Sequence, residues 1–587
     1  MSHVLTLCGT HSDLTAISGP AGLLCELAPD SPWLKGIEPC YRPDELLGSA
    51  DNAISVAHSV VSKLIEHVAG LEGLPRLATM EEPLLEQVSY IVQALHLDRW
   101  ICSRGISSCR FDSYSPWFDR LRQIRALTGS RYELTASVPF GRTNWVERGI
   151  LDLRKSIGRP SELFRRLAPV RSRVLSSIRV RGLARSAPHG GIWFYSTAYN
   201  YTKIALDYED SFPNKMNFLV EDPATGGKGL SEIGRTAYPL YAWSRASDIP
   251  SGSEVRRIGR SITEALAGLP LAAEESLLRT VLLKGEWWDH FRRRVLSFLL
   301  FHERTLERWC EAVVPDMLVV GNAGWERALL QSPIAQRIPS LMLQHGIMHW
   351  VYAVADQPVT YFLIRGKFFQ NLLNDRLRQK TIICNHPERT VPTSERHPSS
   401  RQSILFITMP YAIAPLFHRA DLRDILRCLL RVSYHSGRQL LIRVHPLESI
   451  SSYQERVSEI QKESGFRGEV IYSQGPGAED ILARSSVAIL YFSTMFLDCL
   501  RHGIPIVSLD WHWFPNKGHF KRAEIFNFAS DLRDLEQLVQ RAIEGQLPSR
   551  SASLNEFLAP GRRDEISHLV SELCHSRSRD SKVVSSR

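Results

Sequence analysis

The chain has 587 residues, of which 44% are hydrophobic and 23% are charged, and its formal net charge is +9. This length accommodates roughly three or four domains, and the composition excludes a disordered or fibrous protein. No apolar run approaches the roughly 20 residues that span a bilayer, and the N-terminus lacks the basic and apolar regions of a secretory signal. The ten cysteines are scattered without metal-site spacing, which predicts reduced thiols in a cytoplasmic protein.

Residues 1–150 predict an accessory domain that is either α/β or mainly helical. Residues 4–8 are typical of a strand and lead into the turn Gly-Thr-His-Ser-Asp at 9–13. Apolar residues recur at helix spacing over 54–68 and again over 84–97. A single turn of this kind can host chemistry but is more often only a turn, so the sequence assigns this domain no role.

The positive charge is concentrated between Arg154 and Arg185, where Glu162 is the one acidic residue. We expect residues 151–190 to form a basic linker, and the stretch 170–180 interleaves arginines with apolar residues. Such a segment can lie against anionic lipid headgroups or hold an anionic lipid-linked acceptor. A solvated interdomain helix has the same composition. Nucleic acid is the rival partner, but no recognised nucleic-acid motif accompanies the arginines, so we expect none.

A regular α/β alternation begins at residue 191. Residues 192–195 and 217–220 are typical of buried strands, with a helix expected over 200–208. The second strand is followed by Glu221 and Asp222. Open α/β folds bind ligands at the carboxyl ends of their parallel strands, so both acids are candidates for a general base.

The alternation continues to a polar segment at 390–402 and predicts a first α/β domain over residues 191–390. Further strands are expected at 316–320, 341–344, 359–364 and 382–384. The strand at 341–344 is followed by His345 and Gly346, which place an imidazole and a flexible neighbour at the carboxyl edge. On its own, a histidine in this position is more often a structural residue.

A second α/β domain is predicted over residues 400–565. Its strands are expected at 403–408, 440–444, 469–472, 488–492 and 504–509, with helices at 420–433, 478–485 and 495–502. Near the end of the second strand stand Arg443, His445 and Pro446. Arg443 and His445 can donate hydrogen bonds to a phosphate and offset the charge of a leaving group. Alternatively, Arg443 is a surface residue and His445 a packing residue.

Ser493 and Thr494 stand between the strand at 488–492 and the helix at 495–502. This order of a strand, a turn with two hydroxyl side chains, a helix and a second strand predicts a parallel βαβ unit. The turn presents two hydroxyls and free backbone N–H groups at the carboxyl edge, where such folds bind nucleotide phosphates. The alternative is that both residues only cap the helix.

The motifs RVHP (443–446), YFST (491–494) and FLDCLRHGIPIVSLD (496–510), together with LQHG at 343–346, resemble those of glycosyltransferases with two Rossmann domains, the GT-B type. The chain is most similar to bacterial capsule, teichoic-acid and surface-polysaccharide enzymes, over residues 192–558. The resemblance implies an α/β fold in which two Rossmann-like domains face a cleft, preceded by the accessory domain. It also implies that the second domain binds the nucleotide donor.

The resemblance further implies roles for individual residues. His345 becomes the base that deprotonates an acceptor hydroxyl, a task that suits the pKa of histidine. Arg443, His445, Pro446, Ser493 and Thr494 become the donor-binding set. Asp498 stands where such enzymes often carry a glutamate for the nucleotide ribose, although it can instead neutralise Arg501. Glu221 and Asp222 are similar to an acidic pair of certain bacterial sialyltransferases, which have glycine where this chain has Pro223.

The predicted reaction transfers a sugar from a nucleotide-activated donor to a surface polysaccharide or lipid-linked glycan. No cofactor is expected, and no metal, because helix dipoles, basic groups and hydroxyls can carry the leaving phosphate and no carboxylate cluster of metal-site spacing is evident. We expect a cytoplasmic protein, with peripheral contact to the inner face of the membrane through 154–185. Open alternatives are a nucleotide-sugar epimerase or hydrolase, a CDP-polyol phosphotransferase, or a non-catalytic export component. Residues 566–587 predict a disordered tail.

Overall fold

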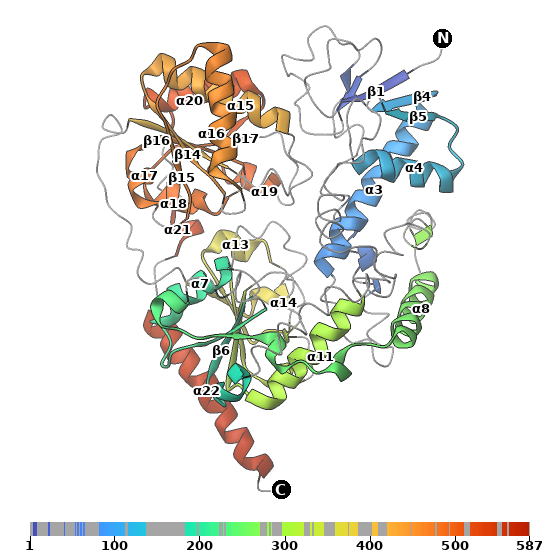
Figure 1. The fold of residues 1–587 in the computed structure, drawn as a ribbon, viewed down its shortest axis with the longest axis vertical. Coiled ribbons are helices and arrows are strands. Elements are labelled where there is room, and N and C mark those ends of the chain that lie inside the picture. Colours follow the sequence, from blue (N-terminus) through green and yellow to red (C-terminus); the bar gives the residue numbers. More distant parts are fainter. Residues whose placement is uncertain are drawn as a thin grey trace. The chain divides into compact units, whose positions relative to one another are not determined.

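The computed structural model describes the larger part of the chain (Figure 1). The described residues are 4–8, 21–23, 40–41, 53, 56–57, 59–61, 63–64, 81–111, 116–136, 182–196, 199–221, 227, 230–269, 279–280, 283, 296–321, 329–330, 334–344, 358–373, 375–384, 402–408, 419–445, 448–475, 478–491, 493–509, 517–548, 554–559 and 563–585. The chain divides into two compact units. One contains residues 1–56, 89–156 and 391–554, and the other contains 57–88, 157–390 and 555–587. Within the described residues, no helix combines the length and the hydrophobicity needed to cross a membrane.

The N-terminal region contains a five-stranded parallel sheet and is therefore α/β. Its strands are β1 (Val4–Cys8), β2 (Ala21–Leu23), β3 (Cys40–Tyr41), β4 (Ser108–Phe111) and β5 (Glu133–Ala136), in the order β3-β2-β1-β4-β5. The helices are α3 (Glu81–Ser103) and α4 (Pro116–Thr128). The expected first strand and the helix over 84–97 are confirmed. The turn at 9–13 and the basic stretch 154–181 lie outside the described residues.

The next sheet has seven parallel strands. They are β6 (Ile192–Ser196), β7 (Asn217–Val220), β8 (Ala237–Pro239), β9 (Met317–Gly321), β10 (Ser340–Leu343), β11 (Tyr361–Ile364) and β12 (Thr381–Ile383). Their order, β12-β11-β10-β9-β6-β7-β8, is that of a Rossmann sheet, in which the order reverses between the first and fourth strands. Here the reversal falls between β6 and β9, which pair in parallel.

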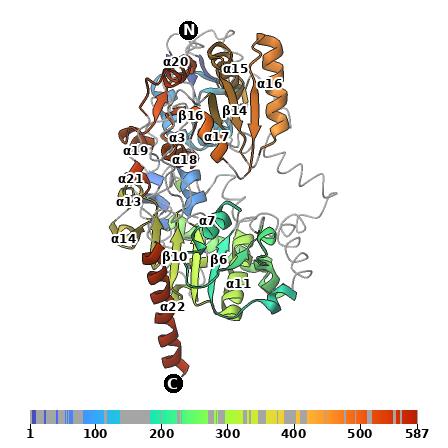
Figure 2. The same ribbon diagram turned by 90° about the vertical axis from the view of Figure 1, so that its left-hand side faces the viewer.

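Helices from distant parts of the chain cover one face of this sheet. This face is packed by α7 (Tyr199–Glu209) and by α22 (Arg563–Ser585), which Figures 1 and 2 show running beside the strands. Ile566 and Val570 of α22 are fully buried against Leu341, Leu343 and Leu363. The prediction of a disordered tail over 566–587 is therefore wrong for the residues up to 585, because this segment forms a helix whose apolar side completes the core.

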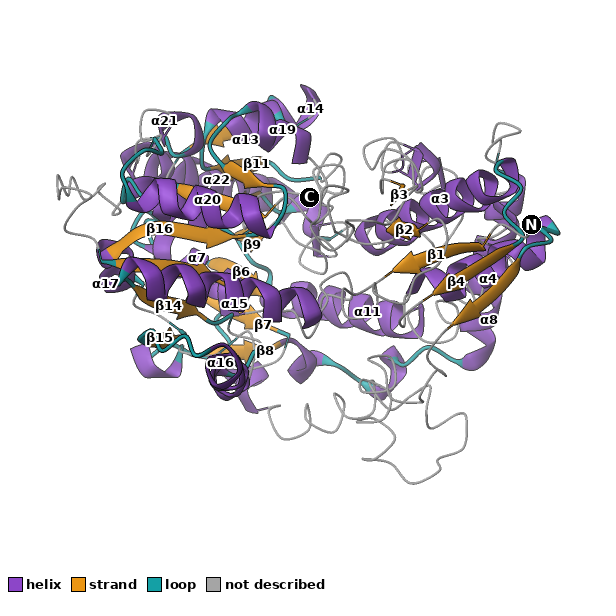
Figure 3. Ribbon diagram, turned by 90° about the horizontal axis from the view of Figure 1, so that it is seen from above, coloured by secondary structure: helices purple, strands orange, loops and turns teal. Residues whose placement is uncertain are grey.

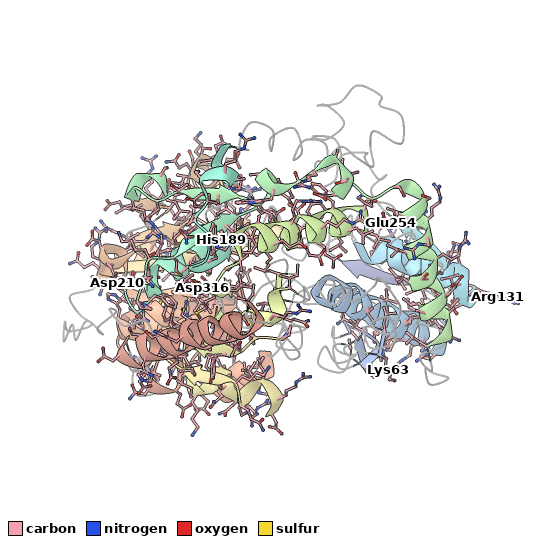
Figure 4. All side chains as sticks on the ribbon, turned by 90° about the horizontal axis from the view of Figure 1, so that it is seen from below. Lys63, Arg131, His189, Asp210, Glu254 and Asp316 are labelled. Carbon is pink, nitrogen blue, oxygen red and sulfur yellow. The ribbon has the colours of Figure 1, made fainter. Side chains whose placement is uncertain are left out.

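The opposite face carries α11 (Leu296–Val313), whose Trp309 meets Trp193 of β6 edge-to-face. Helix α8 (Gly252–Gly268) is joined to α11 by an ion pair between Glu254 and Arg304 (Figure 4 labels Glu254). Short 3-10 turns at Leu240–Trp243 and Ala246–Asp248 also contact α11. The buried carboxylate of Asp248 pairs with Arg308 of that helix. These contacts fix α11 against β6, α8 and the short turns after β8.

Before it enters α22, the chain packs against the segment that follows β11 of the same sheet. Short helices α13 (Lys367–Asn371) and α14 (Asp375–Arg378) lie between β11 and β12, and α21 (Leu554–Phe557) precedes α22. The Phe557 ring lies 4.5 Å from the ring of Phe368, and the Ala559 N–H donates to the Arg365 carbonyl at 2.7 Å. A Cβ on Gly366 would lie 2.3 Å from the Glu556 carbonyl oxygen. Glycine at 366 is therefore required by the close approach of two backbones.

The third sheet has six parallel strands. They are β13 (Ser403–Ile407), β14 (Gln439–Arg443), β15 (Val470–Ser473), β16 (Ser485–Leu490), β17 (Ile506–Leu509) and β18 (Asn527–Ala529). Their order, β15-β14-β13-β16-β17-β18, again has the Rossmann reversal, here between β13 and β16. Five of these strands fall within a few residues of those predicted from the apolar runs, whereas β18 was not predicted.

Helices cover both faces of this third sheet. One face is packed by α15 (Arg419–Ser436), α16 (Ile450–Ser464) and α20 (Leu532–Ile543), which Figure 3 shows lying over the strands. The helices α17 (Glu479–Arg484), α18 (Met495–Arg501) and α19 (Lys517–Arg522) follow β15, β16 and β17. The chain thus has an α/β fold with two Rossmann-like domains after an N-terminal accessory domain, as predicted. The cleft between the two domains stays a prediction.

Candidate functional site

The predicted donor-binding residues gather at the carboxyl edge of the third sheet. In the register of the parallel strands, Ile407 at the end of β13 pairs with Arg443 of β14 and with Leu490 of β16. The chain therefore leaves these three neighbouring strands at one level, into Thr408, His445 and Ser493. This is the point at which the strand order reverses, the usual ligand-binding place of an open α/β sheet.

A partly buried hydrogen-bond network, centred on Thr408 and Glu448, supports this edge. The Thr408 hydroxyl donates to the Glu448 carboxylate at 3.1 Å, and the Tyr453 hydroxyl donates to the same oxygen at 2.7 Å. Burial raises the pKa of Tyr453 well above its usual value, so that its hydroxyl stays a donor. The network joins the end of β13, the loop after β14 and the first part of α16.

The loop that carries His445 is held through its backbone. The His445 N–H donates to the Thr408 hydroxyl at 2.8 Å, and the Glu448 N–H closes a turn on the His445 carbonyl at 2.9 Å. The Gln474 side-chain amide donates to the carbonyls of both His445 and Glu448, each at 2.8 Å. Burial lowers the pKa of the His445 imidazole, which is therefore neutral near pH 7.

Arg443 points its guanidinium toward the end of β15. It donates to the Ser473 hydroxyl and to the Gly475 carbonyl, and burial lowers its pKa. Arginine remains charged under any ordinary condition, so Arg443 places a partly buried positive charge at this edge. Part of its hydrogen-bonding capacity orders the loop after β15, and its predicted contact with a phosphate stays a prediction.

Ser493 and Thr494 have different local roles. The Ser493 hydroxyl accepts the Met495 N–H at 3.3 Å, as a capping side chain does. Thr494 occupies the N-cap position of α18 without a capping bond from its side chain. Both side chains are partly exposed. The alternative that these residues cap the helix therefore applies to Ser493. It does not apply to the Thr494 hydroxyl, which makes no capping bond.

Asp498 is paired within its own helix. Arg501 donates to its carboxylate at 3.1 Å, and Arg501 is almost completely buried. At the end of α18, His502 contacts the Glu479 carboxylate at 2.7 Å. The alternative that Asp498 neutralises Arg501 is therefore confirmed, and its predicted contact with a ribose stays a prediction.

Three predicted site residues, Asp222, His345 and Pro446, lie outside the described residues. Their neighbours, however, are placed. Gln344, next to His345, is buried, and its side-chain oxygen accepts the Arg365 N–H at 2.8 Å. The glutamine of the Gln-His-Gly motif thus ties the end of β10 to the end of β11, and the chain leaves β10 at the carboxyl edge, as predicted.

Glu221 lies at the carboxyl edge of the seven-stranded sheet, directly after β7. Its N–H donates to the Ser196 carbonyl at the end of β6 at 3.1 Å. Its carboxylate accepts the Tyr241 hydroxyl at 3.2 Å, and the side chain is partly exposed. Sequence reasoning found Glu221 but missed Tyr241, because nothing in a short 3-10 turn indicates which strand end it contacts.

The supporting residues Thr408, Glu448, Tyr453 and Gln474 were also not predicted as functional. A polar residue at the end of a predicted strand, two residues before Pro410, was the available signal for Thr408. Within the described residues, no group of three or more His, Cys, Asp or Glu side chains has the geometry of a metal site. Burial raises the pKa of the Cys109 and Cys428 thiols to about 12, so both stay protonated.

No family model matches the chain, and no curated protein matches it. Solved structures with some similarity include a putative UDP-N-acetylglucosamine 2-epimerase from Listeria monocytogenes, at 9% identity and a TM-score of 0.42, over 64% of this chain and 94% of that chain. The UDP-GlcNAc 2-epimerase from Neisseria meningitidis, bound to UDP-GlcNAc, is 11% identical with a TM-score of 0.41, over 66% and 100%. Acinetobacter baumannii MurG is 10% identical with a TM-score of 0.39, over 66% and 99%. Likenesses of this size assign neither an activity nor a substrate, and the strand orders given above are the ground for the fold.

Proposed function

We propose that the chain is a glycosyltransferase that moves a sugar from a nucleotide-activated donor to a hydroxyl of a bacterial surface polysaccharide or lipid-linked glycan. The observation that carries the proposal is the convergence of His445, Ser493 and Thr494 on the reversal point of a Rossmann sheet, at the ends of β14 and β16. That edge is suited to a nucleotide diphosphate, because hydroxyls and a positive charge can contact phosphate oxygens there.

The proposed division of labour follows from the local contacts. Thr494, whose hydroxyl makes no capping bond, donates to a donor phosphate. The backbone of His445 is held by Thr408 and Gln474, and its imidazole is neutral. We propose that the ring donates one N–H to a phosphate oxygen from this fixed backbone position. Arg443 adds positive charge beside the leaving diphosphate.

The acceptor is deprotonated at the other Rossmann-like domain. Glu221, Asp222 and His345 follow strands of that sheet at its carboxyl edge, and each is a candidate base. In the proposed reaction, the acceptor oxygen attacks the anomeric carbon while its proton passes to the base. The bond from the anomeric carbon to the phosphate oxygen breaks, and the electron pair leaves with the nucleotide. We propose that no metal is needed for this step.

The acceptor and the place of action are proposed from charge. The basic stretch 154–185 is suited to anionic lipid headgroups or to a lipid-linked acceptor, which would hold the chain peripherally at the inner face of the membrane. A vesicle sedimentation assay tests this part. Binding to vesicles with anionic lipid but not to neutral ones is expected, and it should weaken as salt is raised.

The central test is thermal stability in the presence of CMP, CDP, UDP, GDP and their activated sugars. A ligand at a hundred times its dissociation constant stabilises the native state by about 2.7 kcal/mol. One base family should raise the melting temperature of the wild type and leave that of the Ser493→Ala/Thr494→Ala variant unchanged. Ser458→Ala, which removes an exposed hydroxyl from the middle of α16, is the matched control and should keep the shift.

Donor consumption separates the open alternatives. An epimerase or hydrolase converts the donor without any acceptor, whereas a transferase requires one. A CDP-polyol phosphotransferase would respond to cytidine nucleotides and release CMP. If no nucleotide shifts the melting temperature, the proposed function is wrong, and a non-catalytic binding role becomes the better description.

A further inference from the structure

A buried histidine, His302, lies between two tyrosine hydroxyls inside the seven-stranded domain. It belongs to α11 and is 1% exposed. Its Nε2 lies 2.9 Å from the Tyr195 hydroxyl of β6, and its Nδ1 lies 3.1 Å from the Tyr241 hydroxyl. Tyr241 in turn donates to the Glu221 carboxylate at 3.2 Å. The four side chains form one continuous chain of hydrogen bonds, from the core of the domain to the carboxyl edge of its sheet.

For a neutral imidazole, the donors and acceptors in these hydrogen bonds have one consistent assignment. A carboxylate only accepts, so the single hydroxyl proton of Tyr241 is directed to Glu221. The Tyr241 oxygen must then accept from His302, which places a proton on Nδ1. In a neutral imidazole Nε2 is an acceptor, and it receives the hydroxyl proton of Tyr195. The geometry therefore specifies a tautomer for His302 as well as its position.

We propose that Tyr241 and His302 are positioning residues for Glu221, and that Glu221 is the base that receives the acceptor proton. This inference rests on the proposed function. Of the three candidate bases, Glu221 is the one that lies within the described residues, and the structure supplies a hydrogen-bond network for its carboxylate. A carboxylate that takes a proton from a hydroxyl must be aimed within a narrow range of angles and distances. Tyr241 aims it, and His302 fixes Tyr241.

The aromatic packing around these residues restricts their motion. The Tyr241 ring stacks on Phe301 with centroids 5.6 Å apart and planes at 6°, and Phe298 lies 5.6 Å from the imidazole. A domain core needs no such polar side chains, because apolar residues of similar volume fill the same space without donors to satisfy. We therefore attribute the buried polar groups of Tyr241 and His302 to the positioning of the Glu221 carboxylate, and not to the stability of the core.

The tautomer gives a test that does not depend on any substrate. The full chain would be labelled with ¹⁵N in its histidine rings, and the His302 signal would be identified by its loss in His302→Gln. The expected wild-type signal is that of a ring with its proton on Nδ1. Tyr241→Phe removes the acceptor of that proton and should move it to Nε2, whereas the matched variant Tyr195→Phe should leave it on Nδ1.

Turnover of a nucleotide-sugar with acceptor supplies the functional half of the test. Tyr241→Phe should lower kcat on the order of 10-fold to 100-fold and leave KM for the donor nearly unchanged. Tyr195→Phe, which removes a hydroxyl from the same histidine but does not touch Glu221, should lose much less. Equal activity of both variants would overturn the positioning role, and an unchanged tautomer in Tyr241→Phe would overturn the hydrogen-bond assignment. If the proton moves to Nε2 in Tyr241→Phe but the wild type binds no nucleotide, the proposed function is wrong and the hydrogen-bond assignment is correct.

Discussion

The hydroxyl of Thr408 lies 2.8 Å from the backbone nitrogen of His445 and so connects the end of β13 to the loop after β14. The same hydroxyl donates to Glu448, and Thr408 is 2% exposed. We expect Thr408→Val, which keeps the shape of the side chain, to destabilise the domain by about 1–3 kcal/mol, because it leaves the partly buried His445 N–H and the Glu448 carboxylate without this partner. Urea unfolding measures this change. Thr408→Ser is the control that keeps the hydroxyl, and equal losses in both variants would contradict the prediction.

Ser493 and Thr494 are expected to respond differently to loss of their hydroxyls. Ser493→Ala removes the acceptor of the Met495 N–H and should cost about 0.5–2 kcal/mol of stability. Thr494→Ala breaks no capping bond and should change stability less, while it weakens the nucleotide-dependent rise in melting temperature. Denaturant unfolding and thermal shift on both single variants separate the two effects. A greater stability loss in Thr494→Ala than in Ser493→Ala would be inconsistent with the capping assignment.

Gly366→Ala is expected to destabilise the domain that contains the seven-stranded sheet. The new Cβ would lie 2.3 Å from the Glu556 carbonyl oxygen, so one of two backbones must move, at a cost of about 1–3 kcal/mol. Gly252→Ala in the first turn of α8 is the matched control, since its Cβ would meet only the far end of Arg256, at 3.5 Å. The control should be neutral or slightly stabilising. Thermal unfolding compares the two, and equal midpoints would refute the close approach.

Ile566→Ala should destabilise the same domain, although residue 566 lies far along the chain from its strands. Ile566 is 1% exposed in the core beneath α22, and deletion of a buried isoleucine side chain costs about 2–5 kcal/mol. Glu572→Ala on the exposed side of the helix should stay within about 0.5 kcal/mol of the wild type. Chemical denaturation measures both. A tail that did not fold would give the same small effect in each variant.

The stability of the second Rossmann-like domain should fall as the pH is lowered through the titration of His445. Burial lowers the pKa of this imidazole below its usual value near 6.5, so the unfolded chain binds the proton more tightly. The contribution of neutral His445 to the free energy of unfolding is fully present above about pH 6.5, the pKa in the unfolded chain. It is lost as the pH falls through the lower pKa of the folded state. Unfolding curves from pH 7.5 to 5 should therefore show a weaker pH dependence in His445→Gln than in the wild type. An unchanged slope would show that His445 is not protected from protonation.

Local pattern predicted most strands of both Rossmann-like domains and missed β8 and β18, which have three residues each. Strands such as β6 and β14 are runs of apolar residues buried on both faces, and these runs mark a parallel sheet without any knowledge of tertiary contacts. The residues at the strand ends, Glu221 and Ser493 among them, could be predicted for the same reason. A strand followed by polar residues fixes which edge they occupy.

Contacts between distant segments could not be predicted. The bond from Tyr195 to His302 joins residues 107 positions apart, and a histidine within an apolar helix gives no sign of its partners. The helix α22 was missed although Ile566, Leu569, Val570 and Leu573 follow helical spacing, because the polar residues after 575 dominated the composition. The guanidinium of Arg443 was expected to be available to phosphate, and only tertiary structure shows its bonds to the next loop.

The position of α22 has a consequence for how the protein is made. The strands of the seven-stranded sheet emerge from the ribosome early, but Ile566 and Val570 emerge only after the whole of the six-stranded domain has been synthesised. Domains usually fold in the order of their synthesis. Here the later domain can reach its native state first, while the earlier one waits with part of its apolar face exposed to water. During that interval the exposed apolar face favours aggregation, and a premature stop codon between β12 and α22 would damage a domain whose strands are all present.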